Sequence, residues 1–234
     1  MKIIFDKDLK HIPICDNNEP LVNIYEVVPG IKISLLKDTL NIVGGAWVRR
    51  EVAIRLATIQ KTISPLGLVV YDAWRPVTLQ KKLFHDYHSL IKRKNPLWSS
   101  KKIRIECEKF VAPVRNGIIP PHTTGGAVDI SIEKKGRLLD MGTTIGECSN
   151  KSATYATSLN ESEKKNRQLL CRIMEEQGFV NYPLEWWHWS YGDRYWAHIL
   201  KQKKSVYGMI DDHSTLIKNI NEIHKVNPQS TRHN

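Results

Sequence analysis

The segment from Pro120 to Ile132 constrains the fold of this chain more than any other stretch. In its second half, apolar side chains recur at every second position: Val128, Ile130 and Ile132. A period of two is typical of a β-strand with a buried face, and it turns Asp129 toward the opposite face. Gly125-Gly126, just before the strand, suits a backbone shaped for close approach. The sequence therefore predicts an interior strand that presents a carboxylate.

The same segment offers metal ligands. His122 precedes Asp129 by seven residues, and far downstream Glu185-Trp186-Trp187-His188 adds a second histidine and another carboxylate. Imidazole nitrogens and carboxylate oxygens are common zinc ligands, and three protein ligands leave the fourth tetrahedral position open for water. The hypothesis from these residues is a catalytic zinc site with His122, Asp129 and His188 as ligands.

A second interpretation of the downstream segment stays open at this level. The tryptophans at 186, 187 and 189 can form an aromatic core patch, with Glu185 and His188 as solvent-facing neighbours. Residues three apart in an ideal strand point to opposite faces, so a shared site requires the chain to twist or bulge there.

An arginine follows a second predicted interior strand. The apolar run Leu68–Tyr71 is typical of such a strand, and it leads into Trp74-Arg75-Pro76. An arginine at a strand end, with proline fixing the exit, can reach into a cleft. A surface arginine before the next helix is the equal alternative.

Periodicity and capping signals predict an alternation of helices and strands. The predicted helices cover residues 48–63, 77–94, 100–110, 158–177 and 194–204, and the predicted strands include 21–28, 31–36, 66–73 and 179–182. Ser158 with Glu161 is a capping-box signature for the fourth helix. We expect one domain over residues 1–210 and an amphipathic extension over residues 211–234.

The chain is strongly basic, with 35 Lys and Arg against 24 Asp and Glu and a formal net charge of +11. Its basic clusters, such as Lys92-Arg93-Lys94, lack interleaved aromatic residues, so we expect a solvated basic surface and no nucleic-acid partner. An anion-binding protein driven by charge is an alternative, and steep salt dependence of binding would mark it.

The four cysteines, at 15, 107, 148 and 171, stand far apart, which predicts free thiols in a reducing compartment. Asp6 interrupts the N-terminal segment before it reaches the length of the apolar core of a signal peptide. No apolar run approaches the ~18 residues of a membrane span. These features predict a cytoplasmic protein without a membrane span. They leave the oligomeric state open.

Five segments occur in an order known from one enzyme family. They are Asp72–Pro76, Pro121–Asp129, Asp140–Thr143, Asn166–Leu170 and Glu185–Asp193. With them the chain resembles the zinc D-alanyl-D-alanine dipeptidases of the vancomycin-resistance (VanX) type over about residues 20–208. The resemblance implies a single α+β domain, with a small antiparallel sheet flanked by helices, as in D,D-carboxypeptidases and the hedgehog signalling domain.

The resemblance also implies functions for particular residues. One Zn²⁺ per chain is held by His122, Asp129 and His188, Glu185 is the general base, and Arg75 stabilises the tetrahedral intermediate. The implied substrate is the dipeptide D-Ala-D-Ala. Thr123 stands at a position that binds substrate in this family, where many members carry serine.

One position departs from the family pattern. Gly146 stands where the family has an aspartate that holds the substrate's amino group, and Glu147 follows directly. Losing a charge-assisted hydrogen bond weakens recognition by about 1.5–3 kcal/mol. We therefore expect a relaxed or altered preference at the amino end, or replacement of the aspartate by Glu147.

Two other functions compete with the dipeptidase. A related D,D-carboxypeptidase would trim longer wall peptides, and export would be expected for it. A non-catalytic zinc-binding or wall-binding module would need neither Glu185 nor Arg75, so the presence of both favours an enzyme.

Overall fold

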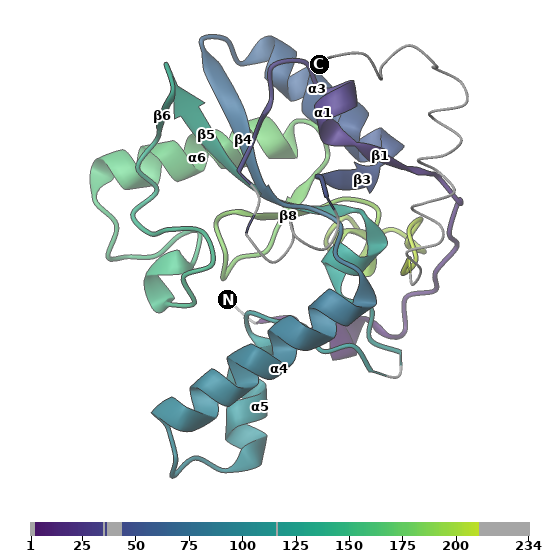
Figure 1. Cartoon of the computed structure of the whole chain (residues 1–234), viewed down its shortest axis with the longest axis vertical. Coiled ribbons are helices and arrows are strands. Elements are labelled where there is room, and N and C mark those ends of the chain that lie inside the picture. The colour runs from purple at the N-terminus through teal and green to yellow at the C-terminus, as the bar shows by residue number, and fades with distance from the viewer. Residues whose placement is uncertain (1–2, 35, 37–43, 116, 211–234) are drawn as a thin grey trace, which may run out of the picture.

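The strand predicted between residues 127 and 132 lies at the centre of a six-stranded sheet, where it forms β5 (Ala127–Lys134; Figure 1). The computed structural model describes residues 3–34, 36, 44–115 and 117–210, so the expected extension at 211–234 lies outside the described residues. The strand order is β2-β4-β5-β8-β7, and β6 also pairs with β5. β5 is antiparallel to β4, β6 and β8, β7 is antiparallel to β8, and β2 is parallel to β4.

The remaining strands are short, apart from β4. They are β1 (Leu21–Asn23), β2 (Lys32–Ile33), β3 (Trp47–Arg49), β4 (Leu66–Asp72), β6 (Arg137–Leu138), β7 (Val180–Asn181) and β8 (His188–Ser190). β1 and β3 form a separate antiparallel pair. The 3-10 helices are η1 (Asp6–Leu9), η2 (Pro121–Thr124) and η3 (Asn150–Ser152).

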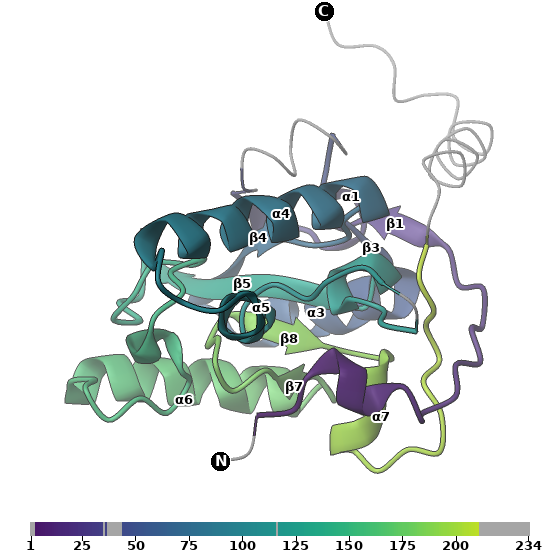
Figure 2. The same cartoon turned by 90° about the horizontal axis from the view of Figure 1, so that it is seen from below.

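Helices cover both sides of the sheet, which confirms the expected α+β fold. They are α1 (Ile24–Val27), α3 (Arg50–Thr62), α4 (Val77–Lys94), α5 (Ser100–Glu108), α6 (Glu161–Glu175) and α7 (Arg194–Ile199). Figure 2 shows α4 and α6 on opposite sides of β5. Among the described residues, no helix combines the length and apolar character needed to cross a membrane.

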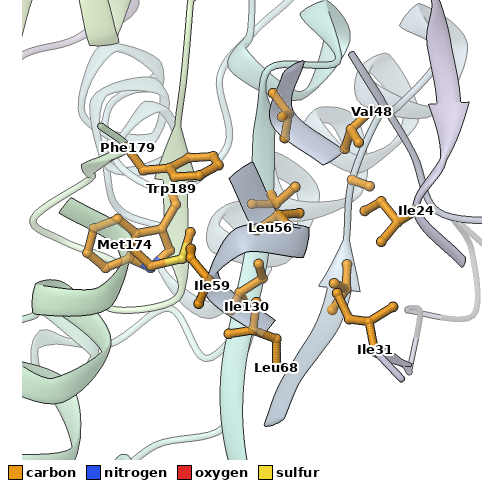
Figure 3. Packing of buried hydrophobic residues seen from close by; sticks show 14 of the residues in the cluster. Ile24, Ile31, Val48, Leu56, Ile59, Leu68, Ile130, Met174, Phe179 and Trp189 are labelled. Carbon is orange, nitrogen blue, oxygen red and sulfur yellow. The ribbon is translucent and has the colours of Figure 1, made fainter. Parts of the chain in front are cut away.

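The main hydrophobic core lies between one face of the sheet and the helices α3 and α6 (Figure 3). Leu56 and Ile59 of α3 and Met174 of α6 meet Leu68 and Ile130 there, all of them almost fully buried. The other face of β5 is also buried: Ala127, Asp129 and Ser131 are 0%, 4% and 3% exposed. The strand is therefore buried on both faces, and the second face holds the polar residues.

The structure corrects several predicted boundaries. The strand expected at 21–28 ends at Asn23, because the Asn23 side chain accepts a hydrogen bond from Tyr25 N and starts α1. The strand expected at 31–36 is reduced to β2, and α7 ends at Ile199 instead of residue 204. The helix expected from residue 48 begins at Arg50, because residues 47–49 pair with β1 as β3.

The capping box of α6 is two residues further along than predicted. Asn160 is the N-cap, its side chain accepts from Glu163 N, and the Glu163 side chain accepts from Asn160 N. The predicted pair of Ser158 and Glu161 is wrong. Asparagine is as good an N-cap residue as serine, so the sequence is compatible with either starting point of the helix.

Candidate metal centre

A register shift between β4 and β5 gathers polar side chains on one face of the sheet. Val70 lies opposite Ile130, but Asp72 lies opposite Asp129, so Tyr71 is the extra residue of a β-bulge. Because successive side chains alternate between faces, the bulge moves Asp72 to the face that carries Asp129. On the other side of β5, His188 is the direct cross-strand partner of Asp129.

His122 reaches the same place from η2, which ends in the double-glycine turn. Gly125 has φ +73°, and a Cβ there would lie 2.5 Å from a side-chain carbon of Leu21. A Cβ on Gly126 would lie 2.3 Å from the Tyr191 carbonyl oxygen. Both glycines are therefore required for the chain to pass this closely.

The three predicted ligands converge on one point. His188 Nδ1 lies 3.0 Å from Asp129 Oδ1, and His122 Nε2 lies 3.3 Å from that oxygen and 3.1 Å from His188 Nδ1. Ligand atoms about 2.0–2.1 Å from a tetrahedral zinc ion lie about 3.3 Å from each other. The triangle of donor atoms therefore fits a small divalent cation such as zinc.

Neighbouring groups set which ring nitrogen faces this point. His122 Nδ1 lies 2.7 Å from the Ala73 carbonyl oxygen, to which it donates, so the lone pair of Nε2 points at Asp129. His188 has Nδ1 at the centre, and its Nε2 lies 3.5 Å from Ser190 Oγ. A partner on the second ring nitrogen is the usual way of orienting a metal-binding histidine.

The protonation states also suit metal binding. Burial raises the pKa of Asp129, but the charges and hydrogen bonds of His122 and His188 outweigh it and hold that pKa well below its usual range. Burial lowers the pKa of His188, although Asp129 opposes the shift. An ionised Asp129 carboxylate and a neutral His188 imidazole are forms that bind a metal ion.

Arg75 points into the site and not to solvent, since its side chain is 13% exposed. Its Nε and Nη2 lie 2.9 and 2.8 Å from Asp72 Oδ2, its Nη1 donates to Gln80 Oε1 at 3.1 Å, and its Nη2 lies 3.6 Å from Asp129 Oδ2. Burial lowers the pKa of Arg75, but Asp72 and Asp129 outweigh it and raise that pKa. The guanidinium is therefore charged and firmly oriented.

Glu185 lies in the turn between β7 and β8, outside any strand. This resolves the spacing problem, because the turn allows Glu185 and His188 to line one cavity. Both are buried, and so are the adjacent tryptophans, so the aromatic patch exists but its two polar neighbours do not face solvent. Burial and the charge of Asp129 raise the pKa of Glu185 well above its usual range, and Arg75 opposes the shift.

These groups share one cavity of about 450 Å³, a volume typical of small-molecule sites. Arg75 and Glu185 line it together with the three metal-ligand candidates. Much of the remaining lining is apolar or aromatic and comes from α4 and the segment after α5: Leu83, Tyr87, Leu90, Phe110, Val111 and Ala112.

The structure does not bring the two expected substrate-binding residues to this lining. Thr123 is fully buried, and its hydroxyl donates to the Pro120 carbonyl within η2. Glu147 is exposed, and its carboxylate accepts from Ser149 Oγ at 2.9 Å. Gly146 does line the cavity.

Sequence reasoning assigned no role to Asp72 or Gln80, although both orient Arg75. Asp72 is fully buried, and Gln80 also donates to the Ala112 carbonyl at 2.8 Å. The signal for Asp72 was an acidic residue at the end of an interior strand, three residues before an arginine.

The chain is similar to known proteins over most of its length. Residues 31–206 match the model of the D-Ala-D-Ala dipeptidase family. A D-alanyl-D-alanine dipeptidase from Synechocystis is 32% identical, over 88% of this chain and 99% of the relative. The protein of that name from Escherichia coli is 28% identical, over 73% of this chain and 83% of the relative.

Among solved structures, the LdcB LD-carboxypeptidase is 19% identical over 86% of this chain and 85% of that chain, with a TM-score of 0.45. The family model covers far more than half of the sequence. The chain therefore belongs to the D-Ala-D-Ala dipeptidase family.

Proposed function

We propose that this protein is a zinc-dependent dipeptidase that hydrolyses D-Ala-D-Ala, with one Zn²⁺ held by His122, Asp129 and His188. One observation carries the proposal: the buried carboxylate of Glu185 and the largely buried guanidinium of Arg75 line the same cavity as the ligand triangle. Binding alone needs neither group. The names of the Synechocystis and Escherichia coli relatives support the choice of substrate.

The chain's own residues supply the rest of the chemistry. When bound, zinc acts as a Lewis acid that lowers the pKa of a coordinated water to about 7. Glu185, whose raised pKa makes it a better proton acceptor, takes the proton of the attacking water and returns it to the leaving amine. Arg75, fixed by Asp72, offsets the negative charge that develops on the carbonyl oxygen.

Replacing the proposed base tests this function. We expect Glu185→Ala to retain zinc and to lose hydrolysis by about 10²- to 10⁴-fold, because proton transfer loses its acceptor. Metal analysis and D-alanine release measure the two effects. Glu161→Ala, on the exposed start of α6, is the matched control. An active Glu185→Ala enzyme would remove Glu185 as the base.

The cavity favours a second candidate, the removal of D-alanine from longer peptides. Its volume of about 450 Å³ is large for a dipeptide with two methyl side chains. Among the described lining residues, Asp86 and Glu108 are the carboxylates beyond Asp129 and Glu185, and both are paired with cations. With Gly146 at the expected amine-binding position, these pairs support a weak preference for a free amino group.

N-acetyl-D-Ala-D-Ala separates the two candidates. A charge-assisted hydrogen bond to the amine, of about 1.5–3 kcal/mol, would give D-Ala-D-Ala about a 10- to 150-fold advantage in kcat/KM. We expect less than a 10-fold advantage, measured as D-alanine released from each compound. A strict preference for the free amine would show that another acid has taken the role, and it would exclude the longer substrates.

A further inference from the structure

Arg167 of α6 is a buried cation that the proposed chemistry does not use. It is 1% exposed, its Nε donates to the Met141 carbonyl at 2.8 Å, and its Nη1 donates to the Ala153 carbonyl at 2.6 Å. Burial lowers its pKa to about 10, so it remains charged at neutral pH. A buried charge is costly unless its contacts compensate. Arg167 therefore ties two separate loop segments to α6.

The loop around Met141 has further anchors on α6. Asn166 Nδ2 donates to the Asp140 carbonyl at 2.8 Å, and within the loop Gly142 N donates to Asp140 Oδ1 at 2.8 Å. Gly142 has φ +82°, and a Cβ there would lie 2.8 Å from the carboxyl carbon of Glu163. The loop is thus held tightly against one face of the helix.

Trp186 is bound by the same two segments that Arg167 holds. Its Nε1 donates to Thr143 Oγ1 at 2.9 Å, and its backbone N donates to the Ser152 carbonyl at 3.1 Å. The Arg167 guanidinium also lies 5.7 Å from the centre of the Trp186 ring. Trp186 directly follows Glu185, so the position of its ring and backbone constrains Glu185.

We propose that Arg167 and Thr143 are positioning residues for the catalytic carboxylate. Arg167 holds the 141–143 loop in place, and Thr143 in that loop orients the indole of Trp186. The position of Trp186 in turn determines the backbone position of the adjacent Glu185, whose side chain lines the cavity. The inference rests on the proposed role of Glu185. Catalytic groups must be held within about 0.5 Å of their working geometry, and a 1 Å displacement can cost about 100-fold in rate.

Thr143→Val tests the chain of contacts, since it keeps the shape of the side chain and removes the oxygen that Trp186 bonds. We expect kcat to fall about 10-fold, with KM and zinc content unchanged. Thr143→Ser, which keeps the hydroxyl, should restore kcat. Arg167→Lys keeps the positive charge but cannot donate to the Met141 and Ala153 carbonyls in the geometry of a guanidinium, so it should also lower kcat. Arg172→Lys, exposed on the same helix, is the matched control.

A full kcat in Thr143→Val would overturn the inference. So would a loss of activity that only follows the folded fraction or the zinc content, because that would indicate a purely structural role. The outcome for Glu185→Ala separates this inference from the proposed function. If Glu185→Ala is inactive and Thr143→Val is fully active, only the positioning role fails. If Glu185→Ala is active, Glu185 is not the base, and the positioning role is overturned with it.

Discussion

Asp129 is the residue on which the charges of the site converge. Its carboxylate faces His122 and His188 through Oδ1 and lies 3.6 Å from Arg75 through Oδ2. Two carboxyl groups, those of Asp72 and Asp129, share the Arg75 guanidinium even before Glu185 is counted. A divalent cation at the ligand triangle would offset this excess negative charge, which is a further reason to expect a metal there.

Asp193 shows how burial acts on a carboxyl group that forms no salt bridge with any of the residues that the structure describes. It caps α7 by accepting from Trp196 N at 2.8 Å, and burial raises its pKa from 3.8 to about 6. A raised pKa means that the folded protein binds the proton more tightly than the unfolded chain. The stability contributed by this group is therefore lost as pH rises from about 4 through about 6.

Asp193→Asn should remove this pH dependence, because asparagine caps a helix as well as aspartate and does not titrate. Between pH 4 and 7 we expect the free energy of unfolding of Asp193→Asn to rise relative to wild type, by at most about 3 kcal/mol. Urea unfolding of both proteins in a chelator measures the difference. If the free energy of unfolding varied with pH in the same way in both proteins, the raised pKa of Asp193 would be contradicted.

At the scale of elements, the β-bulge in β4 makes the site possible. In a regular ladder Tyr71 would pair with Asp129, and Asp72 would then lie opposite Val128 and point into the hydrophobic core. The bulge instead places its carboxylate beside Arg75, 2.8 Å from Nη2. A local irregularity in one strand therefore determines how the guanidinium is oriented.

The start of α6 gives a direct test of an element boundary. Asn160→Ala removes the observed N-cap, and we expect the free energy of unfolding to fall by about 1 kcal/mol. Ser158→Ala, at the exposed residue that the sequence suggested, should leave stability within about 0.5 kcal/mol. Chemical denaturation of both variants measures this. A larger loss for Ser158→Ala would contradict the capping box at Asn160.

At the scale of the molecule, Arg49 joins both ends of the described chain to the metal centre. It is 3% exposed, and it donates to the Thr124 carbonyl at 2.9 Å, the Glu19 carbonyl at 2.6 Å, Asp16 Oδ2 at 2.8 Å and the Gly208 carbonyl at 3.3 Å. Nearby, Ile210 N donates to the Thr123 carbonyl at 2.9 Å. The turn that carries His122 is thus held by segments from both ends.

Removing this junction should affect the whole fold. Arg49→Met removes the donor from the buried Thr124 and Gly208 carbonyls and from two half-buried acceptors, so we expect the free energy of unfolding to fall by about 3 kcal/mol. Arg50→Met, at the exposed neighbouring residue, is the matched control and should change it by less than about 0.5 kcal/mol. Thermal unfolding compares the two. Equal midpoints of thermal unfolding for Arg49→Met and Arg50→Met would show that Arg49 does not hold the two ends of the described chain together.

Prediction from the sequence succeeded where the information was local. The alternation around Ile130 identified the central strand, and the apolar period of α4 predicted its observed bounds, 77–94. It failed where distant segments compete for the same residues: residues 24–27 form a helix, and residues 47–49 pair with β1. Propensity cannot anticipate such tertiary pairing.

The sequence by itself determined the elements around the centre and the chemical groups available to it: two imidazoles, a strand carboxylate, a second acid and an arginine. Only the tertiary structure decided that Asp72 orients Arg75, that a turn brings Glu185 beside His188, and that Thr123 and Glu147 do not line the cavity. The physical reason is that strand register, bulges and turns set which side chains meet. These depend on contacts between residues far apart in the chain, which local periodicity does not encode.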